Sequence, residues 1–138
     1  MSDITIQTDE NWHYLMQAIK GANAKVAQAI KDGLYASGLE VVRRARPKTP
    51  YKTGNLRRSI TTEYQPTFEQ LVGSNEKYAA IHEYGGDIPR TTAWGRKTEP
   101  YVAHYREHAY LRRGLEESEG KIQRIFDTTI KEIMVAAD

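Results

Sequence analysis

The stretch RRARPKTPYKTGNLRRSITTEY, residues 43–64, decides how this 138-residue chain is organised, because it joins two patterns of different period. Pro47 disfavours helical backbone at the residue before it, so a helix that arrives from upstream ends near Ala45. Gly54 and the prolines then predict a loop, and the β-type stretch SITTEY, residues 59–64, predicts a first strand. The sequence therefore predicts a helical N-terminal part followed by a sheet-containing part.

Upstream of Pro47, apolar residues recur every three or four positions, which is the spacing of one helical face. They are Leu15, Ile19, Ala22, Val26, Ile30 and Leu34. We expect one long helix from about Asp9 to Ala45, either bent near Gly33 and Gly38 or divided there into two abutting helices. A stripe of this length exceeds what so small a monomer can cover. Part of it is therefore expected to meet other helices or neighbouring subunits.

Downstream, a second β-type stretch at 69–73 follows the first at a distance that suits a hairpin loop. Residues 77–84 are typical of a short helix of about two turns, closed by the glycine pair that follows. Residues 87–100 are irregular and polar, so we expect either a long loop or a second, poorly patterned hairpin there.

A helical stripe from about His104 to Ala137 predicts the last element, with Gly114 and Gly120 as candidate break points. The fold class expected is α+β, with a long N-terminal helix, a small antiparallel β-sheet, a short helix and a C-terminal helix. The length fits one domain.

We expect residues 1–138 to form that single domain, with 1–45 as a helical arm and 46–138 as the sheet-containing body. Residues 46–58 are expected to be a loop, with which that body begins. Without cysteine, the chain has no disulfide framework, thiol nucleophile, zinc ribbon or iron–sulfur cluster. No uncharged stretch is longer than half of the roughly 18 residues that a membrane span needs, and MSDITIQTDE is unlike a secretory signal.

The net charge of +2 conceals charged blocks of opposite sign. Residues 43–58 contain seven basic residues and no acid, whereas residues 59–87 contain one base and five acids. The basic segment consists of Arg43, Arg44, Arg46, Lys48, Lys52, Arg57 and Arg58. It could contact phosphates, with Tyr51 stacked on a base, or it could pair with acidic patches on neighbouring protein chains. Both interpretations stay open on composition alone.

Histidines raise the question of catalysis. His104 and His108 lie four residues apart on the expected last helix, a spacing at which two imidazoles can share a zinc ion. His82 could act as a general base near a glycine turn. No HExxH motif, nucleophile elbow or phosphate-cradling glycine loop accompanies them. We therefore expect solvated or packing histidines, no metal or cofactor, and no enzyme.

Tyrosine is the commonest aromatic residue, with nine copies against two phenylalanines and two tryptophans. Five of them fall between residues 78 and 110. Tyrosine is enriched at protein interfaces because it combines a large apolar body with a polar tip. A half-exposed small core explains the same enrichment equally well.

Three strings resemble a known family: RPKTPYKTGNLRRSI (46–60), LVGSNEKYAAIHEYGG (71–86) and AYLRRGLEES (109–118). Together they are similar to the small tail-completion or head–tail joining (neck) proteins of tailed bacteriophages and prophages, which are related to phage virion morphogenesis proteins. The matching residues are Thr53, Gly54, Leu56, Arg57, Ser59, Ile60, Val72, Gly73, Tyr78, Ala79, Glu83, Tyr84, Gly85, Tyr110, Leu111, Arg112 and Leu115. The sequence departs from the family at Ala109, where proline is usual, and at Gly114.

The resemblance implies a structural virion protein that forms a ring, expected to be a hexamer, at the neck or at the top of the tail tube. Its partners would be other copies of itself and neighbouring connector, head-closure or tail-tube proteins, with DNA in the lumen as a further contact. Such a protein resides in the virion, and in the host cytoplasm during assembly, without a membrane. The basic segment 43–58 and residues 87–100 are expected to carry the contacts. The alternative is a nucleic-acid-binding module that uses the basic segment.

The physical interpretation of the motif residues is mostly structural. Gly54 can adopt a positive φ in a turn before a strand. Leu56 and Ile60 are expected to anchor this region in the core. Tyr78 and Ala79 should start the short helix, where Glu83 is expected to meet an arginine. None of these roles requires catalysis.

Overall fold

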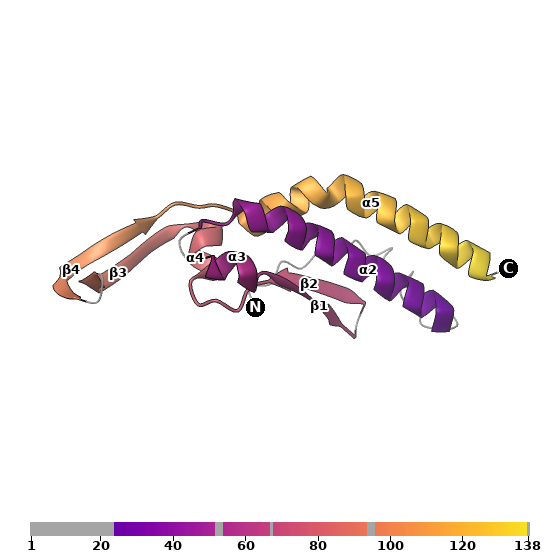
Figure 1. Cartoon of the computed structure of the whole chain (residues 1–138), viewed down its shortest axis with the longest axis horizontal. Coiled ribbons are helices and arrows are strands. Elements are labelled where there is room, and N and C mark those ends of the chain that lie inside the picture. The colour runs from indigo at the N-terminus through magenta and orange to yellow at the C-terminus, as the bar shows by residue number, and fades with distance from the viewer. Residues whose placement is uncertain (1–23, 52–53, 67, 94–95, 138) are drawn as a thin grey trace.

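The computed structural model describes residues 24–51, 54–66, 68–93 and 96–137 (Figure 1). Its elements in chain order are α2 (Ala24–Ala45), the short 3-10 helix η1 (Arg46–Lys48), α3 (Asn55–Ser59), β1 (Thr61–Gln65), β2 (Glu69–Gly73), α4 (Ala79–Tyr84), β3 (Gly86–Ala93), β4 (Arg96–Tyr105) and α5 (Tyr110–Ala137). The expected α+β fold is confirmed, but the strands form two separate two-stranded antiparallel sheets and not one. The expected start of the first helix, near Asp9, lies outside the described residues.

Helix α2 is the middle layer of the molecule, with α5 along one side and the β1–β2 hairpin along the other (Figure 1). The two helices are antiparallel, since Gly33 lies against Thr129 near the end of α5 and Ala45 lies against Gly114 near its start. Gly38 faces the hairpin at Thr62. α2 is one continuous helix through both of its glycines. These glycines are therefore points of close approach to neighbouring elements and do not interrupt the helix.

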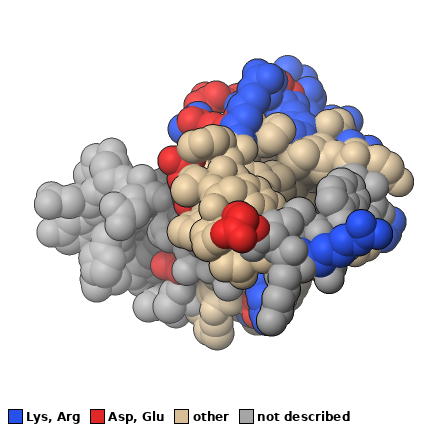
Figure 2. Space-filling view, turned by 90° about the vertical axis from the view of Figure 1, so that its left-hand side faces the viewer, with Lys and Arg blue, Asp and Glu red and all other residues tan. Residues whose placement is uncertain are grey.

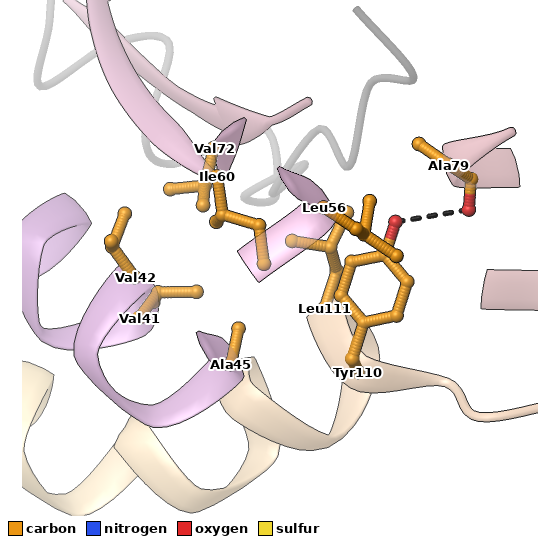
Figure 3. Close-up of a cluster of buried hydrophobic side chains, with 9 residues drawn as sticks. All are labelled: Val41, Val42, Ala45, Leu56, Ile60, Val72, Ala79, Tyr110 and Leu111. Carbon is orange, nitrogen blue, oxygen red and sulfur yellow. Dashed lines mark hydrogen bonds between the residues drawn. The ribbon is translucent and has the colours of Figure 1, made fainter. Parts of the chain in front are cut away.

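The core lies where the end of α2 meets α3, α4 and the start of α5 (Figure 3). Its buried members are Val41, Val42, Ala45, Leu56, Ile60, Val72, Ala79, Tyr110 and Leu111. Burying a side chain of this kind contributes roughly 1.5–3 kcal/mol. The Tyr110 hydroxyl donates a hydrogen bond of 2.9 Å to the carbonyl oxygen of Ala79, so its one polar group is satisfied in the core. Burial raises the pKa of Tyr110 well above its usual range.

The connection at 46–58 contains two short helices, η1 and α3, where the sequence predicts only a loop. Gly54 has the expected positive φ, 76°, and is the N-cap of α3. A helix therefore follows this turn, and not the strand that the sequence predicts. Because α3 continues to Ser59, the first strand begins at Thr61 and not at residue 59. The second strand, 69–73, is confirmed.

The segment 87–100 belongs to a second hairpin, which resolves the alternatives that the sequence left open. β3 and β4 pair from Gly86 opposite Tyr105 to Ala93 opposite Arg96, with a register shift between Arg90 and Thr92. This hairpin projects from the body at the end opposite the C-terminus (Figure 1).

The start of the last helix, expected near His104, is wrong: that residue is in β4, and α5 begins at Tyr110. The reason is the cross-strand pairing of residues 101–105 with residues 86–90, which local helical periodicity does not reveal. α5 then continues without a break through Gly114 and Gly120. Its 28 residues make it about 42 Å long. Across the described residues, no helix has the length and apolar character that a bilayer crossing requires.

Candidate assembly surface

The three motif strings are distant in sequence but meet in one core. Leu56 and Ile60 come from the first string, Ala79 from the second, and Tyr110 and Leu111 from the third, and all five are buried in the same cluster (Figure 3). The expectation that Leu56 and Ile60 anchor their segment in the core is confirmed. The motif therefore builds the framework on which the surface residues are displayed.

Glu83 joins the second string to the third. Its carboxylate is buried and accepts hydrogen bonds from the backbone N–H groups of Leu111, at 2.8 Å, and Arg112, at 3.1 Å. The first N–H groups of a helix lack intrahelical partners, and a carboxylate there also interacts favourably with the helix dipole. The expected arginine partner is thus replaced by backbone: Glu83 meets Arg112 through its main chain and caps α5.

The connection before α5 explains one departure from the family pattern. Ala109 has a positive φ of 47°, and its N–H donates to the carbonyl oxygen of Glu83 at 3.0 Å. A proline has no N–H group, and its φ is fixed near −65°. The conformation seen here is therefore incompatible with the proline that is usual at this position.

Gly85, with φ of 71°, ends α4, and a Cβ added to it would lie 2.8 Å from the backbone nitrogen of Glu107. A side chain at this position would therefore collide with the chain before α5. Tyr78 is the N-cap of α4 and Ala79 its first residue, so the short helix begins two residues later than the expected start at residue 77. Gly73 is the last residue of β2. The rings of Tyr78 and Tyr84 are exposed. Thr53 lies outside the described residues.

Two arginines of the basic segment pair with an acid on their own helix. Glu40 accepts from Arg43 at 2.7 Å and from Arg44 at 3.0 Å, and its side chain is only 10% exposed. These spacings of three and four residues place the groups on one helical face. The hydrogen bond from Arg43, with Arg44 adding to it, lowers the pKa of Glu40 to about 2. The charge of these two arginines is therefore partly compensated within α2.

The third pairing crosses between helices. Lys48 donates to Glu117 of α5 at 2.6 Å and to the carbonyl oxygen of Arg44 at 3.0 Å. This contact holds the pKa of Glu117 below its usual range. An acid of the C-terminal helix thus pairs with the basic segment within one chain, whereas composition predicted such pairing only with acidic patches on neighbouring chains.

The remaining described bases bind uncharged groups. Arg46 donates to the carbonyl oxygen of Ile60 at 3.0 Å, and Arg58 donates to the Asn55 side chain at 2.6 Å. Arg57 donates to the Thr49 hydroxyl at 3.4 Å and lies 4.9 Å from the centre of the Tyr51 ring. Lys52 lies outside the described residues. Among the described residues, Arg46 and Arg57 thus contact uncharged groups, and their positive charge is not compensated by a carboxylate there.

Arg43, Arg46 and Arg57 border an open groove of about 330 Å³ at the end of α2. Its lining is Leu39, Val42, Arg43, Arg46, Pro47 and Arg57. We call it the α2 groove. Its arginines are visible in the sequence by their charge, but Leu39 and Pro47 are not, because nothing local distinguishes an apolar residue at a groove from one in the core.

Charge is distributed in groups over the end of the molecule that carries the β3–β4 hairpin. In the described part of the chain, Lys and Arg atoms gather at one edge of this face with Asp and Glu atoms beside them, and further basic atoms lie across a stretch of uncharged surface (Figure 2). Such a mosaic suits docking against another mosaic of opposite pattern.

The prediction that His104 and His108 lie on one helix is wrong. His104 is in β4, and its Nδ1 forms a 2.6 Å hydrogen bond with the carboxylate of Asp87, its cross-strand neighbour, while His108 lies in the connection before α5. Within the described ranges, no three His, Asp or Glu side chains converge as metal ligands.

His82 lies in a cluster of rings and not at an open cleft. The centres of the Tyr78, Tyr105 and His108 rings lie 5.9, 5.7 and 5.7 Å from that of His82, in edge-on geometry. Burial, followed by the proximity of His108, lowers the pKa of His82. The imidazole thus packs the junction between α4 and the end of β4.

Comparison with known proteins places these features in a family. Residues 35–134, well over half of the chain, match the phage virion morphogenesis family. The sequence is also 41% identical over 85 residues to the Mu-like prophage FluMu G protein 2 of Haemophilus influenzae, which covers 60% of this chain and 56% of that protein. The matched stretch thus spans little more than half the length of this relative. No solved structure matches the chain. The chain belongs to the phage virion morphogenesis family.

Proposed function

We propose that this chain is a structural protein of a tailed bacteriophage or prophage virion, and that it acts in tail completion or head–tail joining. In this proposal, identical copies form a ring, with six members, at the neck or at the top of the tail tube. Family membership supports a structural role in virion morphogenesis, and the similarity to a Mu-like prophage protein supports a phage origin.

The observation that carries the proposal is how the chain uses its motif residues. Glu83, Tyr110 and Ala79 connect helices to one another by hydrogen bonds, and Leu56 and Ile60 fill the core. These are scaffold roles. The surface, in contrast, displays several large apolar side chains, among them Tyr35, Leu39, Tyr51, Tyr84, Val102, Ile130 and Met134. A small core combined with many exposed apolar groups is typical of a subunit that completes its packing in an assembly.

The test of the proposal has a biochemical part and a genetic part. Native mass spectrometry of the purified chain should give a discrete oligomer of more than two copies. A phage or induced prophage lacking the gene should accumulate DNA-filled heads and unjoined or incomplete tails in electron micrographs. A monomer at high concentration, together with normal virions from the deletion, would overturn the proposal.

Nucleic-acid binding through the basic segment is the alternative function. The arrangement of Arg57 over the exposed Tyr51 ring favours it, since guanidinium groups and aromatic rings both stack on bases. The ion pairs of Arg43, Arg44 and Lys48 reduce the charge available for phosphates.

A salt titration of DNA binding separates the two functions. Tight binding that weakens steeply between low and moderate salt would support the alternative. Absence of binding at low salt, with self-association intact, would exclude it. The matched variants are Arg57→Gln and, as a control on the far part of α5, Arg124→Gln.

A further inference from the structure

An exposed stripe runs along α5 at a spacing of three or four residues, so that its members share one helical face. They are Glu116, Glu119, Gln123, Asp127, Ile130 and Met134. We call this the α5 stripe. It is acidic in its first half and apolar at its end, where Ile130 is 53% and Met134 is 65% exposed. Large apolar side chains at this exposure, bordered by charge, mark a docking surface.

The α2 groove has the complementary chemistry. Its floor is apolar, with Leu39 still 45% exposed, and its rim carries three guanidinium groups, those of Arg43, Arg46 and Arg57. Each of these arginines donates one or two hydrogen bonds to other groups of its own chain. A guanidinium has five N–H donors in a planar fork, so donors remain that suit the carboxylates of an incoming segment.

We infer that the α5 stripe of one copy docks in the α2 groove of a second copy. Ile130 and Met134 lie on the floor formed by Leu39 and its neighbours, and Asp127 faces the arginine rim. Asp127 stands one turn before Ile130, about 4.5 Å along the helix, so both can engage one groove. This inference rests on the proposed self-association and names the two surfaces that carry it.

The contact must be between copies because the two surfaces lie at different places along the same helix pair. The groove is at the end of α2, where Ala45 contacts Gly114 at the start of α5. Ile130 follows Thr129, which contacts α2 at Gly33. Ten residues of helix, about 15 Å, separate Gly33 from the level of Arg43. Since the α5 stripe and the α2 groove are distinct surfaces, the contact is head-to-tail. Such contacts close into a ring if the rotation from one copy to the next permits it.

Three variants test the inference at exposed positions. Leu39→Lys places a charge in the groove floor, and the double variant Ile130→Lys/Met134→Lys places two charges where the stripe meets that apolar floor. Thr128→Lys, at an exposed site of α5 outside the stripe, is the matched control. Far-UV circular dichroism and urea titration should give wild-type folding for all three. The first two should weaken self-association by at least roughly tenfold, as expected when a central contact is lost, and the control should not.

Mixing is the decisive step. The groove variant keeps an intact stripe and the stripe variant keeps an intact groove, so an equimolar mixture can make one good contact and no more. Native mass spectrometry with one variant isotopically labelled should show a 1:1 heterodimer that neither variant forms alone. Wild-type assembly beyond two copies, combined with this heterodimer, supports the inference.

Two results would overturn the inference while leaving the proposed function intact. One is a wild-type ring that both variants still form. The other is loss of association in the variants without any heterodimer on mixing. A wild-type protein that stops at a symmetric dimer would refute the head-to-tail contact. A wild-type protein that remains monomeric would refute the proposed ring itself, so the two failures are distinguishable.

Discussion

At the scale of single residues, the two glycines of α5 are a matched pair with opposite expected effects. A Cβ at Gly114 would lie 2.9 Å from backbone atoms of Ala45, whereas nothing lies within 4 Å of a Cβ at Gly120. Gly114→Ala should therefore lower the free energy of unfolding by about 1–3 kcal/mol, because α2 and α5 must separate. Gly120→Ala should raise it by about 0.5–1 kcal/mol, since alanine is the better helix former.

Urea denaturation followed by circular dichroism measures both changes under one set of conditions. The two variants add the same methyl group to the same helix, so helix propensity cancels between them. Equal shifts in both would contradict the tight approach of α2 to α5.

Glu83 is the residue whose replacement should affect α5 most directly. In Glu83→Gln, one carboxylate oxygen becomes an NH₂ donor that faces a backbone N–H, and the charge at the helix start is lost. We expect a loss of about 1–3 kcal/mol in unfolding free energy. Glu116→Gln, at an exposed position of α5, is the control and should change stability by less than about 0.5 kcal/mol. An unfolding free energy of Glu83→Gln equal to that of wild type would argue against the cap.

At the scale of one element, the ion pairs of Glu40 with Arg43 and Arg44 make the stability of α2 depend on pH. Its folded-state pKa of about 2 lies below the ordinary value of 4.5. The unfolded chain therefore takes up the proton first as pH falls. The contribution is complete above about pH 4.5 and is lost as the pH falls towards 2. We expect about 1 kcal/mol from this cluster, because the partner Arg43 is largely exposed and screened by solvent.

Urea midpoints of wild type and Glu40→Gln at pH 6, 4 and 3 provide the measurement. The difference between the two proteins should be greatest at pH 6 and should shrink at pH 3. Glu132→Gln, exposed near the end of α5, is the reference for general effects of removing one acid. A difference independent of pH would refute the role assigned to the Glu40 carboxylate.

How well each element could be predicted followed from how local its signal was. The end of α2 was predictable because Pro47 acts on its immediate neighbours, and the stripes of α2 and α5 because helical spacing is written in consecutive turns. The β3–β4 hairpin was only one of two alternatives, because Gly86 and Tyr105 are paired across 19 positions. The same pairing explains why His104 was assigned to a helix.

The candidate site shows the same division. The positive charge of residues 43–58 is visible in composition, and the spacing of Glu40 from Arg43 and Arg44 was available in the sequence. The pairing of Lys48 with Glu117 was not, since 69 residues separate them. The α2 groove likewise exists only because η1 and α3 return Pro47 and Arg57 to the end of α2.

At the scale of the whole molecule, the parts differ in what holds them in place. α2, α5 and the β1–β2 hairpin share a packed interior, whereas within the described ranges the backbone ladder of β3 joins β4 and no other strand. A two-stranded ribbon is marginally stable in water by itself. The free energy of local opening should therefore be low at residues 86–93 and 96–105 and close to the global value around Val41 and Leu111.

Amide hydrogen exchange would measure this difference in the free energy of local opening. In the isolated subunit, the hairpin amides should exchange within the dead time of a mixing experiment, while amides of the central helices persist until the molecule unfolds as a whole. Slower amide exchange in the β3–β4 hairpin after assembly would show that a neighbouring subunit or partner contacts it. A projecting ribbon that is weakly protected alone thus becomes a reporter of when, and in what order, copies and partners add to the particle.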